Sequence, residues 1–202
     1  MNRQEYSVTR ARTTWKPRVT EEDLPLFYCP ECGAYYIGVA KNQSASFEGS
    51  GRSLIAQPPF LGIDIPQCCG SSMIKTPYLG LNDLPGGLTL DYTFVGGFNN
   101  NSLKISWELG ANNNQISWVY LKTFTGTQLK YVYPQKRSPL IFAFADEDAF
   151  AYCDKSPCEE CVFRCKSGFV AYVCISELGV VRMPLDRMTV IGSNSTALPQ
   201  EK

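Results

Sequence analysis

The 202-residue chain contains no histidine. Histidine is the side chain that most often acts as a general base near neutral pH, and it is the commonest nitrogen ligand of zinc, iron and copper. Its absence therefore excludes catalysis by a Ser–His–Asp triad or a Cys–His pair. Any metal site in this protein has to be built from thiolate or carboxylate groups.

An excess of charge and long apolar runs are also missing. The 19 basic residues balance the 19 acidic ones, so nothing favours nucleic acid or an anionic membrane as a partner. The apolar runs are short, for instance Pro139 to Phe144, whereas a membrane span needs ~20 residues. Residues 1–19 lack the apolar stretch of a secretory signal. We therefore expect a cytoplasmic protein without nucleic-acid or membrane partners.

Cysteine, by contrast, is abundant. Nine cysteines in a chain without an export signal indicate metal binding or redox chemistry, because a reducing cytosol disfavours disulfides. An odd number also fits a complete disulfide framework poorly. The alternative is a secreted, disulfide-bonded protein, which the N-x-S/T triplets at Asn42, Asn100 and Asn194 would suit.

The patterning of the chain predicts an all-β fold with two structured parts, a cysteine-bearing ribbon (25–80) and an antiparallel β-sandwich (81–192). A polar arm (1–24) precedes them and a flexible tail (193–202) follows them. Alternating or β-branched runs bounded by turn residues predict the sandwich strands. These strands are Leu88–Val95, Ser102–Leu109, Ile116–Phe124, Gln128–Tyr133, Ile141–Ala145, Phe169–Ile175 and Gly179–Met183. Thr125 to Thr127 is expected to form a tight turn, and Asp146 to Tyr152 a short helix.

Aromatic residues recur along the expected strands. They are Trp107, Trp118, Tyr120, Tyr131 and Tyr133. We expect them to pack in the core and across neighbouring strands. An aromatic platform for carbohydrate is the alternative interpretation.

Four cysteines in the first third of the chain have the spacing of a metal site. Cys29 and Cys32 form a C-x-x-C-G knuckle with Gly33, and Cys68 and Cys69 form a second, glycine-ended pair. The two-residue spacer lets both sulfurs face one ion, and the glycine permits the tight turn that leaves amides free to hydrogen-bond the thiolates. We therefore predict one iron or zinc ion in a four-cysteine site. Adjacent cysteines on an extended backbone point to opposite sides, so distorted geometry is expected at the second pair.

The motif C-x-x-C-G followed by C-C-G-x-x-M, which ends at Met73, resembles the desulforedoxin motif of desulfoferrodoxin-type superoxide reductases. In that family the motif holds one iron. The match covers Tyr28 to Met73, and residues 33–67 form a longer interval between its halves than the family's usual hairpin.

The resemblance continues over roughly residues 25–175. Ser102 to Ser106 and Gln115 to Leu121 resemble the strands on either side of the family's histidine loop, and Phe163 to Phe169 resembles its closing cysteine, histidine and glycine segment. It implies a rubredoxin- or desulforedoxin-like metal ribbon followed by an immunoglobulin-like sandwich. By resemblance alone, a homodimer is also a plausible arrangement.

The chain departs from the family at the reaction centre. The family's active iron has four equatorial histidines and one axial cysteinate. Cys165 matches the cysteine, but Asn114 or a neighbour stands where a histidine belongs, and a neutral amide oxygen is a weak ligand beside a thiolate. We therefore expect no ordinary superoxide reductase activity. Altered superoxide or peroxide chemistry at Cys165 is a further hypothesis.

A second cysteine cluster follows the pattern C-x4-C-x2-C-x3-C. Its members are Cys153, Cys158, Cys161 and Cys165. It suggests a second iron, zinc or iron–sulfur centre. The alternatives are a zinc-stabilised or disulfide-bonded loop and a catalytic dithiol at Cys158 and Cys161. Cys174, nine residues beyond Cys165, is expected to be an ordinary buried residue.

Two functions fit these features. The first is a redox protein that keeps a one-electron iron site, works with an unidentified redox or protein partner, and has lost its reductase centre. The second is a zinc-stabilised structural module that acts through protein interactions. The sequence does not separate them, because a thiolate site accepts either ion.

Overall fold

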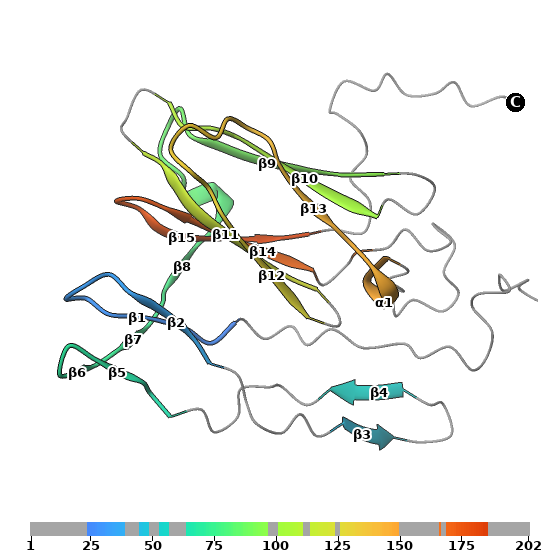
Figure 1. Ribbon diagram of the computed structural model, residues 1–202, viewed down its shortest axis with the longest axis horizontal. Coiled ribbons are helices and arrows are strands. Elements are labelled where there is room, and N and C mark those ends of the chain that lie inside the picture. The colour runs from blue at the N-terminus through green and yellow to red at the C-terminus, as the bar shows by residue number, and fades with distance from the viewer. Residues whose placement is uncertain are drawn as a thin grey trace, which may run out of the picture.

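The computed structural model describes residues 24–38, 45–48, 53–56, 64–96, 101–110, 114–123, 126–149, 166 and 169–185. These residues form a small ribbon attached to a larger β-sandwich, and strands dominate throughout (Figure 1). The predicted all-β fold, with its metal-type ribbon followed by an antiparallel sandwich, is confirmed. Among these residues, no helix has the length and apolar character needed to cross a membrane.

The ribbon is built from short antiparallel strands. Its three-stranded sheet has the order β2-β1-β7, with β1 at Leu26–Tyr28, β2 at Tyr35–Ile37 and β7 at Ile74–Lys75. A tight hairpin beside it pairs β5 (Gln67–Cys68) with β6 (Ser71–Ser72). A separate hairpin, β3 (Ala45–Glu48) with β4 (Ser53–Ala56), lies in the long interval between the two cysteine pairs.

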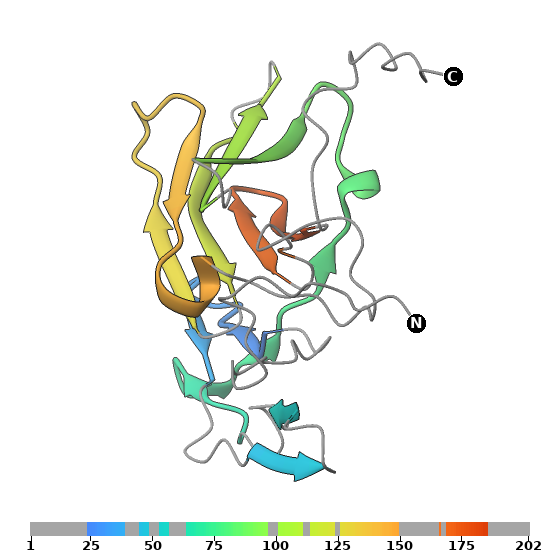
Figure 2. The same cartoon turned by 90° about the vertical axis from the view of Figure 1, so that its right-hand side faces the viewer.

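The sandwich consists of two sheets, which Figures 1 and 2 show from two directions. The smaller sheet has the order β13 (Leu140–Ala143), β10 (Ser102–Glu108), β9 (Thr89–Val95). The larger sheet has the order β12 (Thr127–Tyr131), β11 (Ile116–Lys122), β14 (Val170–Ile175), β15 (Gly179–Pro184), β8 (Tyr78–Leu79). Only the β15–β8 pair is parallel among the described sandwich pairings.

The predicted sandwich strands are all present, with ends that shift by a few residues. The β11–β12 hairpin is confirmed, and the Thr123 amide donates to the Gly126 carbonyl at its turn. The first turn of the predicted helix is observed as α1 (Asp146–Ala149), and the rest of that prediction lies outside the described residues. A short 3-10 helix, η2 (Leu81–Asp83), connects β8 to the smaller sheet.

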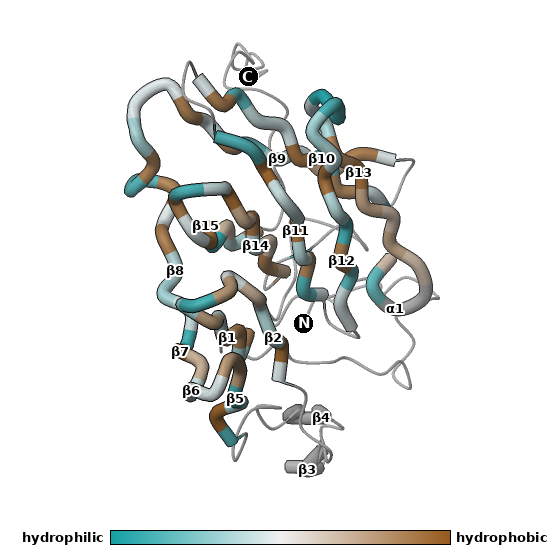
Figure 3. Tube along the Cα trace, turned by 60° about the vertical axis from the view of Figure 1, so that its left-hand side comes forward, coloured by the Kyte–Doolittle hydropathy of each residue, from teal (hydrophilic) through white to brown (hydrophobic). Residues whose placement is uncertain are grey.

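Strand β14 explains how the two parts are joined. All six of its residues are buried, because it is covered on both faces. Ala171, Val173 and Ile175 point into the core between the sheets, whereas the alternate side chains pack in a second cluster with ribbon residues such as Leu24 and Leu26. The sequence of β14 is therefore hydrophobic along its whole length, and Figure 3 colours most of this strand as hydrophobic.

Hydrogen bonds hold the start of the ribbon against this face. The Leu24 amide donates to the Tyr172 hydroxyl at 3.1 Å, and the Tyr78 hydroxyl donates to the Leu24 carbonyl at 2.7 Å. The two tyrosine rings are in contact, with centroids 5.0 Å apart. The ribbon is thus fixed to the outer face of the larger sheet by both apolar and polar contacts.

The aromatic residues divide into two groups. Trp107, Trp118 and Tyr120 pack against the two apolar clusters as predicted. Tyr131 lies opposite Trp118 in the β11–β12 register, but its side chain is 66% exposed. Tyr133 is 72% exposed and lies beyond the end of β12. Tyr131 therefore has the predicted cross-strand position without core burial, because β12 is an edge strand. For Tyr133, which is exposed beyond the end of β12, the prediction is wrong.

Candidate metal centre

The first pair of cysteines lies on a tight turn between β1 and β2. The Gly33 amide donates to the Cys29 carbonyl, and the Cys29 amide donates to the Ala34 carbonyl, each at 2.9 Å. Gly33 has φ +70°, a left-handed conformation in which a β-carbon is unfavourable, although the space around it is empty. The turn glycine predicted for the C-x-x-C-G knuckle is confirmed, and its role is conformational.

The second pair lies on the turn of the β5–β6 hairpin. Cys68 is the last residue of β5, whereas Cys69 and Gly70 form the two-residue loop and both have positive φ, +50° and +77°. Such a loop has the twist of a type I′ turn, and it usually contains asparagine or glycine at its first position. The expectation of an extended backbone at this pair is therefore wrong, because the left-handed residue turns both sulfurs to one side.

The two turns bring the four sulfurs together. All of them lie within 4.8 Å of one another, with 3.6 Å between the Sγ atoms of Cys32 and Cys68 and 3.8 Å between those of Cys68 and Cys69. A tetrahedral site with metal–sulfur bonds of ~2.3 Å has sulfurs about 3.8 Å apart. The Cys32–Cys68 and Cys68–Cys69 separations match this value, and the group of four predicted ligands can hold a metal ion.

The four thiols differ in exposure and in acidity. Cys29 is buried, Cys68 is half-buried, and Cys32 and Cys69 are exposed. The backbone amides of Cys32 and Glu31 hydrogen-bond the Cys29 sulfur and lower the pKa of its thiol to about 7. Hydrogen bonding with the Cys32 thiol raises the pKa of Cys68 to about 12, and the same neighbour raises the pKa of Cys69. Cys29 is therefore the more readily ionised of the three thiols with shifted pKa values, and a bound cation would favour the thiolate form of its ligands.

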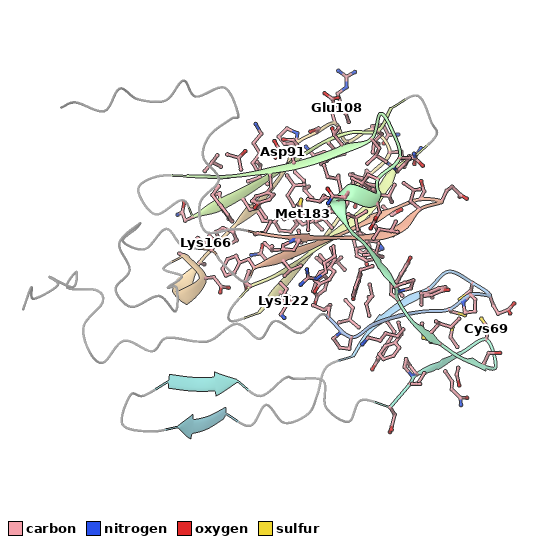
Figure 4. The ribbon with its side chains drawn as sticks, turned by 180° about the vertical axis from the view of Figure 1, so that it is seen from behind. Cys69, Asp91, Glu108, Lys122, Lys166 and Met183 are labelled. Atoms are coloured by element: carbon pink, nitrogen blue, oxygen red, sulfur yellow. The ribbon has the colours of Figure 1, made fainter. Side chains whose placement is uncertain are left out.

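A small apolar cluster supports the site from within the ribbon. Phe27, Cys29 and Met73 are buried together, and Cys68 packs against them. Met73 is the methionine of the C-C-G-x-x-M pattern, and its amide donates to the Pro66 carbonyl at 2.8 Å. Cys69 lies at the tip of the ribbon, on the side away from the sandwich (Figure 4). The centre is consequently anchored on one side and open to solvent on the other.

The second predicted cluster, Cys153, Cys158, Cys161 and Cys165, lies outside the described residues, as does the altered reaction centre suggested at Cys165. The residues that flank it are described. Lys166 is fully buried, and its Nζ donates to the carbonyls of Asp148 and Ala149 at 2.8 Å each. Figure 4 places Lys166 beside α1. The described residues before and after the second cluster are thus joined by hydrogen bonds of one lysine side chain.

Three residues around these sites were not singled out from the sequence. They are Lys166, Tyr35 and Tyr172. Cys174 is buried in β14, as expected, and after burial it is the next cause that raises the pKa of the Tyr35 hydroxyl. A lysine directly after Cys165 gives no sign of burial in the sequence. The tyrosines look like ordinary strand residues, because their partners lie far away along the chain.

The fold and the cysteine cluster together define a class of protein, a β-sandwich with an attached four-cysteine ribbon that can hold a metal ion. Among solved structures, the superoxide reductase from Treponema pallidum is similar over 80% of this chain and 97% of its own, with 17% sequence identity and a TM-score of 0.41. These values indicate a distant likeness of fold and nothing about activity. No protein-family model matches the chain, and no curated protein sequence matches it.

Proposed function

We propose that the ribbon binds one metal ion through Cys29, Cys32, Cys68 and Cys69. The observation that carries this proposal is the sulfur spacing of 3.6–3.8 Å between successive neighbours Cys32, Cys68 and Cys69. The left-handed backbone of Cys69 adds support, since an L-residue there costs roughly 1–2 kcal/mol. A conformation of this kind persists when a function needs it.

We further propose that the ion is iron and that the protein passes single electrons. A bound iron would supply one-electron redox chemistry, and four fixed sulfurs would need little rearrangement between its two oxidation states. The exposure of Cys32 and Cys69 supports this function, because it leaves an edge of the site open to a redox partner. Zinc in the same ligands, with a structural and interaction role, is the alternative.

Elemental analysis and an absorption spectrum test this proposal. The protein would be produced and purified anaerobically, in iron-replete medium without added zinc. Iron with thiolate-to-iron charge-transfer bands that dithionite bleaches would support the electron-transfer function. Zinc in a colourless protein would support the structural alternative, while absence of any bound metal would contradict both.

A matched pair of variants identifies the ligands. Cys32→Ser should abolish the metal of the ribbon or weaken its binding strongly, because one thiolate of the four is lost. Cys174→Ser should retain the full metal content, since Cys174 is a buried cysteine outside the cluster. Equal metal loss in both variants would show general destabilisation and would contradict the ligand assignment.

We propose a second thiolate site at Cys153, Cys158, Cys161 and Cys165. The contact between Lys166 and the Ala149 carbonyl favours it, because the described residues on either side of the segment lie close together, which lowers the entropic cost of closing a site between them. Two or more metal ions per chain are then expected. The double variant Cys158→Ser, Cys161→Ser should lose only the additional metal, and unchanged metal content in it would contradict this proposal.

A further inference from the structure

A groove of about 340 Å³ lies where the ribbon meets the sandwich. It is bounded by β2 on the ribbon and by β11 and β12 on the larger sheet, which lie near one another in Figure 3. Five of its eight lining side chains are aromatic, namely Tyr35, Tyr36, Trp118, Tyr120 and Tyr131. The other three are aliphatic, so none of the eight carries a charge or an amide.

One corner of the groove is held rigidly. The rings of Tyr35 and Trp118 meet edge to face, with centroids 5.2 Å apart and planes at 79°. The Tyr35 ring also lies 6.4 Å from the Tyr28 ring, centroid to centroid. A preformed corner of this kind lowers the entropic cost of binding a ligand.

The rim of the groove is accessible and comes from both parts of the molecule. Tyr36 of β2 is 47% exposed, and Tyr131 of β12 is 66% exposed. Aromatic rings that are half exposed at the edge of an apolar groove leave their faces available to another ring. Apolar sites of this size at the junction of two structural units are common ligand sites in proteins.

We propose that this groove binds a neutral, planar compound of two or three fused aromatic rings. The ligand is neutral because no lining side chain offers it an opposite charge. It is planar because aromatic rings line the groove from two sides, and compact because ~340 Å³ is near the lower limit for ligand pockets. A carbohydrate fits less well, since the four tyrosine hydroxyls and the Trp118 indole N–H are the only polar side-chain groups of the lining.

Fluorescence anisotropy with lumichrome tests this proposal. Lumichrome is a neutral, fluorescent three-ring compound that does not react with thiols. Titrating the metal-loaded protein into it should raise the anisotropy, with a Kd of about 100 µM or lower for a ligand of this size. No rise up to a tenfold higher protein concentration would overturn the proposal.

Exposed tyrosines provide the variants and their control. Tyr36→Ala and Tyr131→Ala should each weaken binding roughly three- to tenfold through the loss of one ring contact. Tyr133→Ala should bind like the wild type, because this exposed tyrosine does not line the groove. Equal weakening in all three variants would overturn the proposal. Displacement of lumichrome by an oligosaccharide or a proline-rich peptide at lower concentrations would do so as well, because it would identify a different occupant.

Discussion

Cys69 shows how a single backbone conformation creates the metal centre. At φ +50° it occupies a position where asparagine or glycine is more favourable. Its sulfur reaches 3.8 Å from that of Cys68, a separation that two successive residues of an extended strand do not give. The conformation of this residue thus places the sulfurs of an adjacent pair where one ion could be held.

Gly33 provides the left-handed backbone of the other cysteine turn, the one between β1 and β2. Its substitution leads to a prediction. Gly33→Ala introduces a β-carbon at φ +70° without any clash, so its cost is conformational, about 1–2 kcal/mol. We expect metal affinity to fall roughly five- to thirtyfold in competition with a chelator. Gly126→Ala is the control, because this glycine has neither positive φ nor close neighbours. Equal affinity of Gly33→Ala and the wild type would contradict this account.

Ionisation of Tyr35 makes the folding stability of the protein depend on pH in the alkaline range. Burial is the main reason that the pKa of Tyr35 rises from 10.0 to about 12. The folded protein therefore keeps this proton at a pH where the unfolded chain loses it. The stability that Tyr35 contributes is fully present below about pH 10 and is lost as the pH rises towards about 12.

The raised pKa of Tyr35 leads to a measurable change of stability with pH. The urea midpoint of the metal-loaded protein should fall as the pH is raised from about 9 to about 11. The fall should be shallower in Tyr35→Phe, which has no phenol to ionise at this position. Tyr133→Phe should keep the wild-type slope, because its exposed ring is already in water. A Tyr35→Phe slope equal to that of the wild type would contradict the assignment.

At the scale of elements, β14 and the first residues of the ribbon depend on one another. Tyr172 is only 1% exposed, and its hydroxyl accepts the hydrogen bond from the Leu24 amide. Tyr172→Phe leaves that buried amide without this acceptor, which should cost about 1–3 kcal/mol. The measurement is urea unfolding of the metal-loaded protein, with Tyr133→Phe as the exposed control. A loss no larger than in the control would show that water replaces the hydroxyl.

Several elements could be predicted from the sequence because their signals are local. Buried and more exposed side chains alternate along β10: Leu103 and Ile105 are fully buried, and Lys104 between them faces outward. The same alternation of apolar and polar residues is present in the sequence. Strand β8 was not predicted. It is only two residues long, Tyr78–Leu79, and it exists because β15 pairs with it in parallel.

At the scale of the molecule, the ribbon and the sandwich differ in how much apolar core each possesses. Phe27, Cys29 and Met73 are the buried residues of the ribbon's own cluster, whereas eighteen buried residues form the sandwich core. A core as small as that of the ribbon needs a metal or another covalent constraint to remain folded. The sandwich should not need the metal.

Metal removal therefore has an expected outcome. After treatment with a strong chelator under reducing conditions, backbone amides of residues 26–37 and 67–75 should lose hydrogen-exchange protection. Amides of β10, β11 and β14 should keep theirs, since their pairing does not involve the cysteine cluster. Simultaneous loss of protection in both parts would show one cooperative unit and would contradict this division.

The sequence by itself determined which four cysteines form the candidate site and the class of fold. The absence of histidine, the C-x-x-C-G knuckle and the period-two strands are local signals, because side-chain chemistry and backbone preference act over a few residues. Tertiary structure decided the rest. The approach of the two cysteine pairs to one another, the burial of Lys166 and the aromatic groove at Tyr35 all depend on packing between segments distant in sequence. No local sequence pattern encodes such contacts, since each forms only when elements distant in the sequence pack against one another.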